Sequence, residues 1–354
     1  MSEAQLTVNT APEVSLGDPN QTGGGGNMPP PLSATRPRHR GIGWRARLEI
    51  TVLSGPAILV FVAFVIVPVF VALYYGFFSW KGYGPATNFI GLDNYKWTLT
   101  NKDFWGAVEH NGIIAVLSLL MQGPLAILIA LLLNKKMRGR SIIRVLIFVP
   151  YVISEAVVGI GFSLMLQDAG AVNGLLTKIT HGVGSLLHIQ SAATATVSAS
   201  WISDPKIAIW TLMFVLTWKY IGFAIILMLA GLQGIPEELS EAAAVDGASY
   251  WQIQRHIMLP LLGPTIRIWA FLSIIGSMQL FDLVYIIWGQ YIGSIAGTST
   301  MAYFMAQNGR LSGQLGRGSA IAIVVFVISL IVALLYQRFV LRRDTDGALT
   351  ERED

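Results

Sequence analysis

Three ionisable residues interrupt long apolar stretches of this chain: Glu155, Lys219 and Asp282. A charge in a hydrocarbon layer is costly unless it faces water or a partner, so such residues often belong to a pathway or a proton relay. For Lys219 we expect either a structural role, by pairing or snorkelling, or contact with a substrate. For Glu155 we expect pairing with Lys219 or a place in the lining of a pathway, and the residues alone leave these choices open.

A second candidate is the polar segment that joins two apolar stretches, residues 234–260. Pro236 can open a helix, and three acids follow in its first turns, where the helix dipole favours negative charge: Glu237, Glu238 and Glu241. Gly247 offers a left-handed stop, and a second short helix is predicted over 248–257, limited by Pro260. The segment therefore predicts a helix–glycine–helix elbow.

The elbow has the chemistry of a contact surface. Its small residues Ala242 and Ala243 would let another protein approach closely, and its acids suit basic partner residues. The alternative is an interfacial helix that merely links two membrane spans.

Several kinds of site are excluded by residues that the chain lacks. It has no cysteine, which excludes disulfides, Cys-ligated zinc, iron–sulfur clusters and thiol catalysis. Its five histidines are scattered, and neither a spaced carboxylate pair nor a nucleophile–base set stands out, so we expect no metal, no catalytic residues and no enzymatic activity. A Gly-x4-Gly-Lys-Ser/Thr loop is also absent, so the chain has no phosphate-cradling loop and we expect no cofactor of its own.

The elements that carry these residues are predicted to be membrane helices. Of the 354 residues, 53% are hydrophobic and only 12% charged, which excludes an ordinary soluble enzyme and makes lipid a partner. About 20 apolar residues span a bilayer as a helix. On that basis the sequence predicts an all-α, polytopic protein with six transmembrane helices, at about residues 50–80, 111–133, 144–166, 206–232, 264–288 and 318–336.

The basic residues predict the orientation of these spans. With six spans and both ends on one side, 16 of the 24 Lys and Arg residues fall on the side of the termini and 7 on the other. Such an excess marks the cytoplasmic side, so both termini are predicted to be cytoplasmic. The basic residues cluster at span ends and form no patch on a soluble domain, so no nucleic acid is expected as a partner.

The composition also predicts three regions. Residues 1–48 read as a disordered cytoplasmic tail, rich in Gly and Pro, that ends in a basic juxtamembrane segment. Residues 49–342 form the six-helix domain with the loop 234–260, and 343–354 form a short cytoplasmic tail.

The elbow resembles the EAA motif (EAA-x3-G-x9-I-x-L-P) of the inner-membrane permease subunits of bacterial binding-protein-dependent ABC importers. Every motif position matches: Glu241, Ala242, Ala243, Gly247, Ile257, Leu259 and Pro260. Other segments resemble the carbohydrate-uptake branch, the relatives of the maltose and glycerol-3-phosphate permeases: Phe89 to Tyr95, Gly170 to Asn173, Leu175-Leu176, Trp218-Lys219 and Phe281 to Tyr285. The similarity covers roughly residues 45 to 345.

This resemblance implies a type I ABC importer permease fold in the bacterial cytoplasmic membrane. It also implies that the EAA elbow docks on a cytoplasmic ABC ATPase dimer, which binds ATP in place of this chain. Two further partners are implied, a second, non-identical permease subunit and an extracytoplasmic solute-binding protein. Glu155 could then also contact the partner permease, and Asp282 would be a structural residue of the family.

The resemblance further implies a substrate pathway for a sugar or related polyol, an oligosaccharide or glycerol phosphate. Positions matching those of the maltose importer lie on the spans before and after the elbow: Trp218, Lys219, Tyr220, Phe223, Ser277, Gln279 and Leu280. Aromatic rings can stack on sugars, and the alternative for each of them is ordinary helix packing or anchoring at the membrane interface.

A secondary transporter is the alternative from another class. In it Glu155, Lys219 and Asp282 would form an ion relay. Such transporters normally contain inverted repeats, and the sequence shows no convincing internal repeat. Dependence of uptake on ATP or on an ion gradient would separate the two hypotheses.

Overall fold

The computed structural model describes residues 44–135 and 138–342. Residues 1–43 of the predicted tail at 1–48, and the whole predicted tail at 343–354, lie outside this part of the chain, while residues 44–48 lie in a helix that begins at Trp44. Within it the secondary structure is helical, without a strand, and Phe78 and Phe89 form an isolated β-bridge. The all-α prediction is confirmed.

A boundary between two units of the chain follows Leu59. The first described helix, α1 (Trp44–Phe61), begins in the first unit, and its apolar side chains are largely exposed. A π-helical turn (Val62–Ile66) and α2 (Val67–Tyr75) follow it in the second unit. Residues Ile50–Tyr75 form an uninterrupted apolar helix of 26 residues, long enough to span a membrane.

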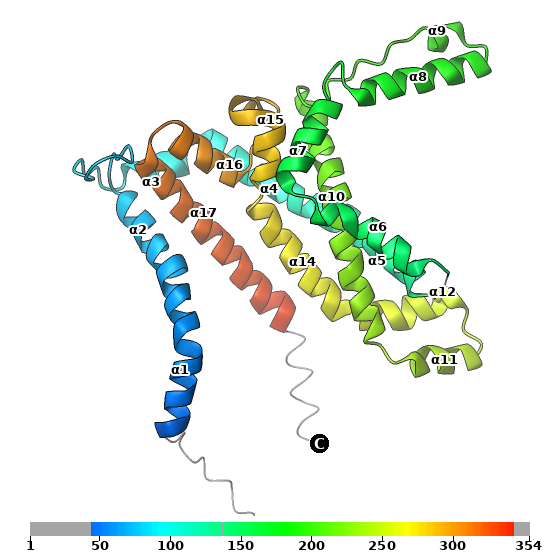
Figure 1. Ribbon diagram of the computed structural model, residues 1–354, viewed down its shortest axis with the longest axis horizontal. Coiled ribbons are helices and arrows are strands. Elements are labelled where there is room, and N and C mark those ends of the chain that lie inside the picture. Colours follow the sequence, from blue (N-terminus) through cyan, green and yellow to red (C-terminus); the bar gives the residue numbers. More distant parts are fainter. Residues whose placement is uncertain (1–43, 136–137, 343–354) are drawn as a thin grey trace, which may run out of the picture. The chain divides into compact units, whose positions relative to one another are not determined.

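The second unit contains the remaining helices, which Figure 1 shows in chain order. The first group is α3 (Asp93–Thr100), α4 (Lys102–Leu117), α5 (Gly123–Asn134), α6 (Arg140–Val152), α7 (Glu155–Met165), α8 (Ala171–Leu186) and α9 (Gln190–Ala193). The second group is α10 (Pro205–Gln233), α11 (Glu237–Val245), α12 (Tyr250–Ile253), α13 (Leu259–Leu261), α14 (Gly263–Met278), α15 (Asp282–Ile295), α16 (Met301–Ala306) and α17 (Leu315–Tyr336). The 29-residue helix α10 runs between the hairpin of α8 and α9 at one end and α11 at the other (Figure 1).

Four helices of the described chain are long and apolar enough to span a membrane, and two bent pairs raise this number to six if each pair is one span. The first pair, α6 and α7, is bent by 88°. The second joins the segment Tyr250–Leu261 to α14 with a bend of 62°. Two predicted spans are therefore wrong as continuous helices: the third is broken at 153–154, and the fifth ends at Met278, before α15 begins.

Buried polar side chains explain how the break after α14 is tolerated. In a bilayer, backbone groups that leave a helix have no water to bind. The amide of Asn111 donates to the Ser277 carbonyl at 2.5 Å, and the Thr300 hydroxyl donates to the Leu280 carbonyl at 2.6 Å. Asn111 lies on α4 and Thr300 caps the start of α16, so tertiary contacts compensate for the break.

Three proline residues inside membrane helices follow a π-helical turn. Pro68, Pro124 and Pro260 come after π turns at Val62–Ile66, Ser118–Gln122 and Gln254–Met258. A proline in a helix lacks an N–H and clashes with the carbonyl four residues earlier. The wider π turn makes room for the proline ring, so these helices continue through it.

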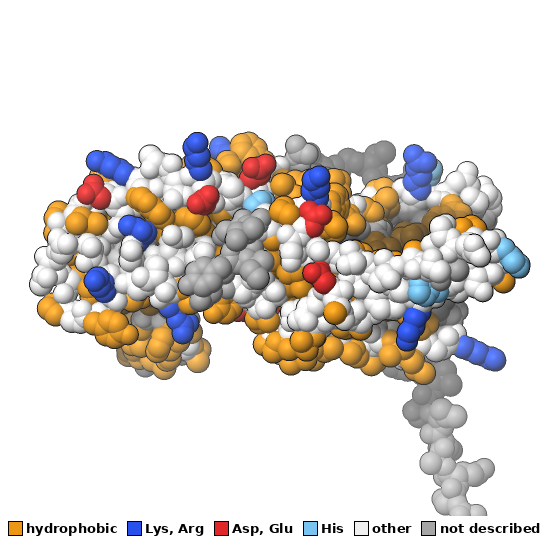
Figure 2. All heavy atoms as spheres, turned by 90° about the horizontal axis from the view of Figure 1, so that it is seen from above, with side chains coloured by type: hydrophobic (Ala, Val, Ile, Leu, Met, Phe, Trp, Pro, Cys, Tyr) orange, Lys and Arg blue, Asp and Glu red, His pale blue; other side chains and the backbone are white. Residues whose placement is uncertain are grey.

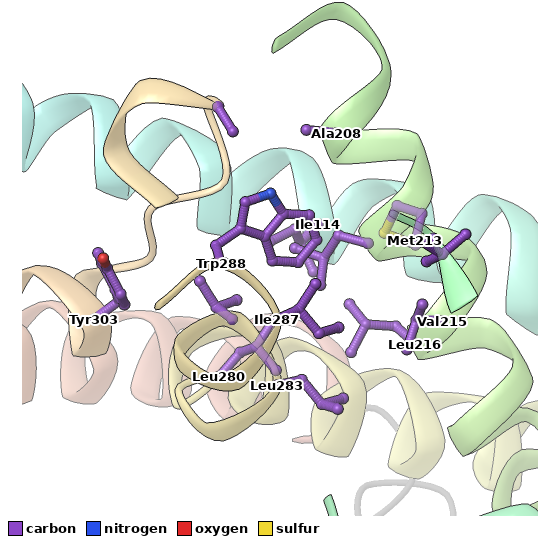
Figure 3. Packing of buried hydrophobic residues seen from close by; sticks show 14 of the residues in the cluster. Ile114, Ala208, Met213, Val215, Leu216, Leu280, Leu283, Ile287, Trp288 and Tyr303 are labelled. Atoms are coloured by element: carbon purple, nitrogen blue, oxygen red, sulfur yellow. The ribbon is translucent and has the colours of Figure 1, made fainter. Parts of the chain in front are cut away.

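One hydrophobic cluster packs α4, α10 and α15 against one another. Figure 3 shows the Trp288 indole pointing toward Ile114 on α4 and Met213 on α10. Trp288 is 1% exposed, and its indole N–H donates to the Ile202 carbonyl at 2.9 Å. A second cluster joins α5, α10 and α14 to the segment that contains α12 and α13. Together these clusters hold the helices that surround the candidate site.

Two asparagines in the segments that resemble permeases tie loops to helix ends. Asn94 donates to the carbonyls of Gly76 and Phe78 at 3.0 and 3.1 Å, which fixes the chain after α2. The carboxamide oxygen of Asn173 accepts from the Trp201 indole at 2.8 Å, which fixes the chain between α8 and α10. Both residues are buried, so each satisfies groups that would otherwise lack partners.

Figure 2 shows the end of the second unit that carries α8, α15 and α16. Acidic and basic side chains are interspersed with apolar ones over this face. A surface of mixed charge is well solvated, which suits a face in water.

Candidate functional site

A cavity of about 310 Å³ lies among helices of the second unit, between α4, α6, α10 and α14. Its lining is mostly apolar with a few polar groups: Ile114, Ser118, Gln122, Tyr151, Leu216, Tyr220, Phe223, Trp269, Leu272, Ser273, Gly276, Ser277 and Leu280. No charged side chain is among these lining residues. This composition is typical of a small-molecule site.

Aromatic side chains from α6 and α10 form one wall of the cavity. The rings of Tyr151 and Phe223 stack, with centroids 5.1 Å apart and an interplanar angle of 20°. The Tyr220 ring meets Tyr151 edge-on at 6.2 Å, and its hydroxyl donates to the Glu155 carboxylate. The hydroxyl is thereby occupied, and the ring faces of this wall remain for stacking.

The polar groups lie mainly on α14 and on the π turn after α4. The hydroxyls of Ser118 and Ser273 are 2.7 Å apart, and the Ser277 hydroxyl donates to the Ser273 carbonyl at 2.8 Å. The Gln122 amide donates to the Thr217 hydroxyl at 3.4 Å. Amide and hydroxyl groups can both donate and accept, as a ligand with many hydroxyls requires.

The structure brings together four of the seven predicted pathway residues. Tyr220, Phe223, Ser277 and Leu280 line the cavity. The other three lie elsewhere: Trp218 is 38% exposed and packs edge-on against Phe162 in an apolar groove, Gln279 lines a hollow beside Arg310, and Lys219 is buried.

Several lining residues were missed from the sequence. Ser118 and Gln122 are spaced by four, as are Ser273 and Ser277, so each pair falls on one helix face. Polar residues at this spacing inside an apolar helix are the signal that could have identified them. Tyr151 and Trp269 gave no comparable signal.

The three intramembrane ionisable residues do not share one arrangement. Lys219, 2% exposed, donates to the carbonyls of Pro150, Tyr151 and Ile153 at 3.5, 3.2 and 2.6 Å. Glu155 accepts from Tyr220 instead, while Asp282 is exposed in the first turn of α15, where the helix dipole favours an acid. Among the described residues no group of three His, Asp or Glu side chains could hold a metal ion.

The predicted elbow forms, with Gly247 at its bend. Gly247 has a φ of +85°, in the left-handed region. Its N–H donates to the Ala244 carbonyl at 3.1 Å, and the N–H of Ala248 donates to the Ala243 carbonyl at 2.9 Å. These two bonds form a Schellman motif, which ends α11 and turns the chain. The prediction of a glycine stop is confirmed.

The second half of the elbow begins and ends later than predicted. Ser249 and Gln252 form a reciprocal capping box, so the helix starts at Tyr250 and not at Ala248. It then passes through the π turn and ends at Leu261, one residue beyond Pro260. The π turn accommodates the proline, which is why Pro260 does not stop the helix.

The two sides of the elbow differ in exposure. Ala243 and Ile257 pack against the second hydrophobic cluster, which anchors the elbow to α10 and α14. Glu241 and Ala242 are exposed on α11, and Leu259 and Pro260 are exposed further along. An acid beside a small residue is therefore open to a partner.

A polar hollow of about 250 Å³ adjoins the elbow and is lined in part by Arg140, Gln233, Glu237 and Glu241. With its amide oriented to satisfy both donors, the Gln233 oxygen accepts from Arg144 at 2.9 Å and from Arg140 at 3.0 Å. These hydrogen bonds tie the start of α6 to the end of α10, beside the elbow.

Comparisons with known proteins identify the family and the fold. Residues 122–345 match the family described as "Binding-protein-dependent transport system inner membrane component". The chain is 29% identical over 282 residues to the trehalose/maltose transport system permease protein MalF of Thermococcus litoralis, covering 79% of this chain and 90% of that protein. It is 32% identical over 303 residues to the probable ABC transporter permease protein y4oQ of Sinorhizobium fredii, covering 83% and 92%.

A solved structure has the same fold. It is that of a bacterial alginate ABC transporter in complex with an alginate pentasaccharide-bound periplasmic protein. The TM-score is 0.69 at 23% identity, with 84% of this chain and 97% of that chain covered. The predicted importer permease fold is thereby confirmed.

The family match covers the elbow, every helix from α5 to α17 and the lining residues of the cavity from Gln122 onward, and it extends over more than half of the chain. The chain therefore belongs to the binding-protein-dependent transport system inner membrane components: it is a multi-pass permease subunit of an ABC importer in the cytoplasmic membrane and not an enzyme.

Proposed function

We propose that this permease moves a saccharide through the cavity between α4, α6, α10 and α14. The observation that carries the proposal is the lining, in which stacked Tyr151 and Phe223 face hydroxyl and amide groups. Sugar rings present C–H faces to aromatic rings and hydroxyls to paired donors and acceptors. A relative named for the transport of trehalose and maltose supports this choice of substrate class.

Within this class the cavity favours an uncharged saccharide over glycerol phosphate. No Lys or Arg side chain is among the residues that line it, and Lys219 directs its ammonium to backbone carbonyls. A phosphate buried without a cation would lose its hydration without compensation. An oligosaccharide or a disaccharide therefore suits this chain better.

A separate cytoplasmic ABC ATPase dimer docks on the elbow and hydrolyses the ATP that drives transport. Glu241 and Ala242 are exposed on α11, and Gly247 fixes the bend. Glu241 supplies a charge for a basic group of the ATPase, while the small alanine allows close approach. The chain needs no cofactor of its own in this arrangement, because nucleotide binds to the partner.

The remaining partners complete the pathway. A second, non-identical permease subunit forms the other half of the pore, and an extracytoplasmic binding protein delivers the sugar. The structural neighbour bound to a periplasmic protein supports the latter partner. The chain lies with both termini in the cytoplasm, as its basic residues predict, so the elbow faces the ATPase.

ATP-dependent uptake tests this proposal against a secondary transporter. The assembled complex is reconstituted in proteoliposomes with its binding protein, and uptake of labelled maltose, maltotriose and trehalose is measured with ATP inside or with an ion gradient alone. Uptake that requires ATP supports the proposal, whereas uptake driven by the gradient contradicts it.

Two variants of the elbow test docking in the same assay. Glu241→Lys and Gly247→Asp should abolish uptake and leave the protein in the membrane. Normal uptake by both variants, at normal protein levels, would contradict docking through the elbow.

A further inference from the structure

Lys219 and Tyr220, two adjacent residues of α10, hold the two sides of the break between α6 and α7. α6 ends at Val152, Ile153 is extended, and α7 begins at Glu155. The last carbonyls of a helix have no helical donor, and inside a bilayer there is no water to replace one. The break therefore needs partners from another element.

The Lys219 ammonium supplies them on the side of α6. An ammonium has three N–H donors, and here it meets three carbonyls, those of Pro150, Tyr151 and Ile153. A cation at the C-terminus of a helix is also favoured by the helix dipole. This explains how a lysine that is only 2% exposed is tolerated in an apolar helix.

Tyr220 supplies the partner on the side of α7. Its hydroxyl donates to the carboxylate of Glu155, the first residue of α7. An acid in a first turn is favoured by the positive end of that helix. Adjacent residues of α10 thus bind both helix ends at the break. Lys219 places a cation at the C-terminus of α6, and Tyr220 binds the carboxylate at the N-terminus of α7.

α6 also lies unusually close to α10 at this level. A Cβ at Gly222 would collide with the Ile147 carbonyl and lie 3.2 Å from the Phe148 Cα. The same turn of α10 carries Phe223, which stacks on Tyr151. The position of α6 therefore sets the position of the Tyr151 ring in the cavity.

We propose that Lys219 and Glu155 are positioning residues that clamp the α6–α7 break to α10 and thereby place Tyr151, Tyr220 and Phe223 around the cavity. Neither residue is among those that line it. This inference is tested in two ways. The measurement of transport rests on the proposed function, whereas the measurement of thiol labelling rests on the geometry alone.

The first readout is the amount of saccharide moved per ATP hydrolysed by the reconstituted complex. This ratio does not depend on how much protein is assembled, so a loss of folding alone does not move it. Lys219→Met should lower it by about tenfold, the factor expected for one charge-assisted hydrogen bond, and Lys219→Arg should restore it in part. Lys206→Met, an exposed lysine on the same helix, should leave it unchanged.

The second readout needs no substrate. The chain has no cysteine, so Gly276→Cys provides a single thiol at the cavity wall, where no atom lies within 4 Å of a Cβ. In the assembled complex, Lys219→Met should raise its labelling rate by a water-soluble maleimide about tenfold. Tyr220→Phe removes only the hydroxyl and should raise the labelling rate less. This variant replaces Lys219→Met in the labelling test if Lys219→Met does not assemble.

The outcomes separate the clamp from the transport function. If the wild-type complex moves no saccharide but the clamp variants raise the labelling rate, the transport function fails and the clamp stands. If Lys219→Met and Tyr220→Phe both label at the wild-type rate, or if Lys219→Arg is as defective as Lys219→Met in the transport ratio, the clamp is overturned.

Discussion

The bend of the elbow depends on one backbone conformation, and replacing Gly247 tests it. With a φ of +85° and no atom within 4 Å of a Cβ, a new side chain there meets open space, so its cost is purely conformational. The left-handed region costs a residue with a Cβ about 1–2 kcal/mol, and asparagine visits it more readily than alanine does. Gly247→Ala should therefore lower the ratio of folded to open elbow about 5–30-fold, and Gly247→Asn should lower it less.

Hydrogen exchange followed by mass spectrometry measures this directly. The N–H groups of Gly247 and Ala248 are bonded to α11 at 3.1 and 2.9 Å, so opening of the motif exposes them. In the detergent-solubilised complex, the peptide spanning 237–250 should exchange faster in Gly247→Ala by the same factor of about 5–30.

Gly112→Ala is the matched control for this experiment. Gly112 lies inside α4, also with open space around a Cβ, so alanine there should slow exchange locally or leave it unchanged. Wild-type exchange in Gly247→Ala, or equal rates for the alanine and asparagine variants, would refute the argument that left-handed strain controls the elbow.

Three further variants test the packing and the cavity. Gly222→Ala should push α6 from α10 and lower the stability of the complex by about 1–3 kcal/mol, seen as a lower apparent Tm, and an unchanged Tm would contradict the close approach. Asn111→Ala should remove the acceptor of the Met301 N–H at 2.8 Å and one of two donors to the Ser277 carbonyl, at about 1–3 kcal/mol, and a thermal scan that matches the wild type would oppose this role. Tyr151→Ala should lower saccharide transport by about three- to tenfold through lost stacking, whereas Tyr151→Phe should retain it, and equal loss in both would argue against an aromatic wall.

Local chemistry explains why the elbow could be predicted. A proline opening, acids in the first turns and a glycine at the bend act within a few residues of one another, so the sequence places α11 and its left-handed stop correctly. The approximate positions of the spans could also be predicted, because the length of an apolar stretch is a local property of the sequence. The later start of the second half, set by the box between Ser249 and Gln252, is also local and could have been recognised.

The two helix breaks could not be predicted in this way. Each depends on a side chain far away in the sequence, Lys219 for the break before α7 and Asn111 for the break after α14. Without these partners, residues 144–166 and 264–288 read as continuous apolar helices. Long-range hydrogen bonds therefore decided what local hydropathy could not.

Helix geometry explains the mixed outcome for the pathway residues. Each step along an α-helix turns by about 100°, so Trp218 and Tyr220, two positions apart, point to nearly opposite sides of α10 and cannot face the same cavity. The structure turns Tyr220 and Phe223 toward the cavity and Trp218 toward Phe162. A face-by-face assignment of α10 would have excluded Trp218.

Affinity purification of the tagged full chain in mild detergent, with mass spectrometry of the proteins that copurify, tests the central claim most directly. The account predicts recovery of an ATPase with a Gly-x4-Gly-Lys-Ser/Thr loop and of a second permease with its own EAA segment. It also predicts that Glu241→Lys loses the ATPase and keeps the second permease. A monodisperse chain without an ATPase, or undiminished ATPase recovery with Glu241→Lys, would contradict coupling through the elbow.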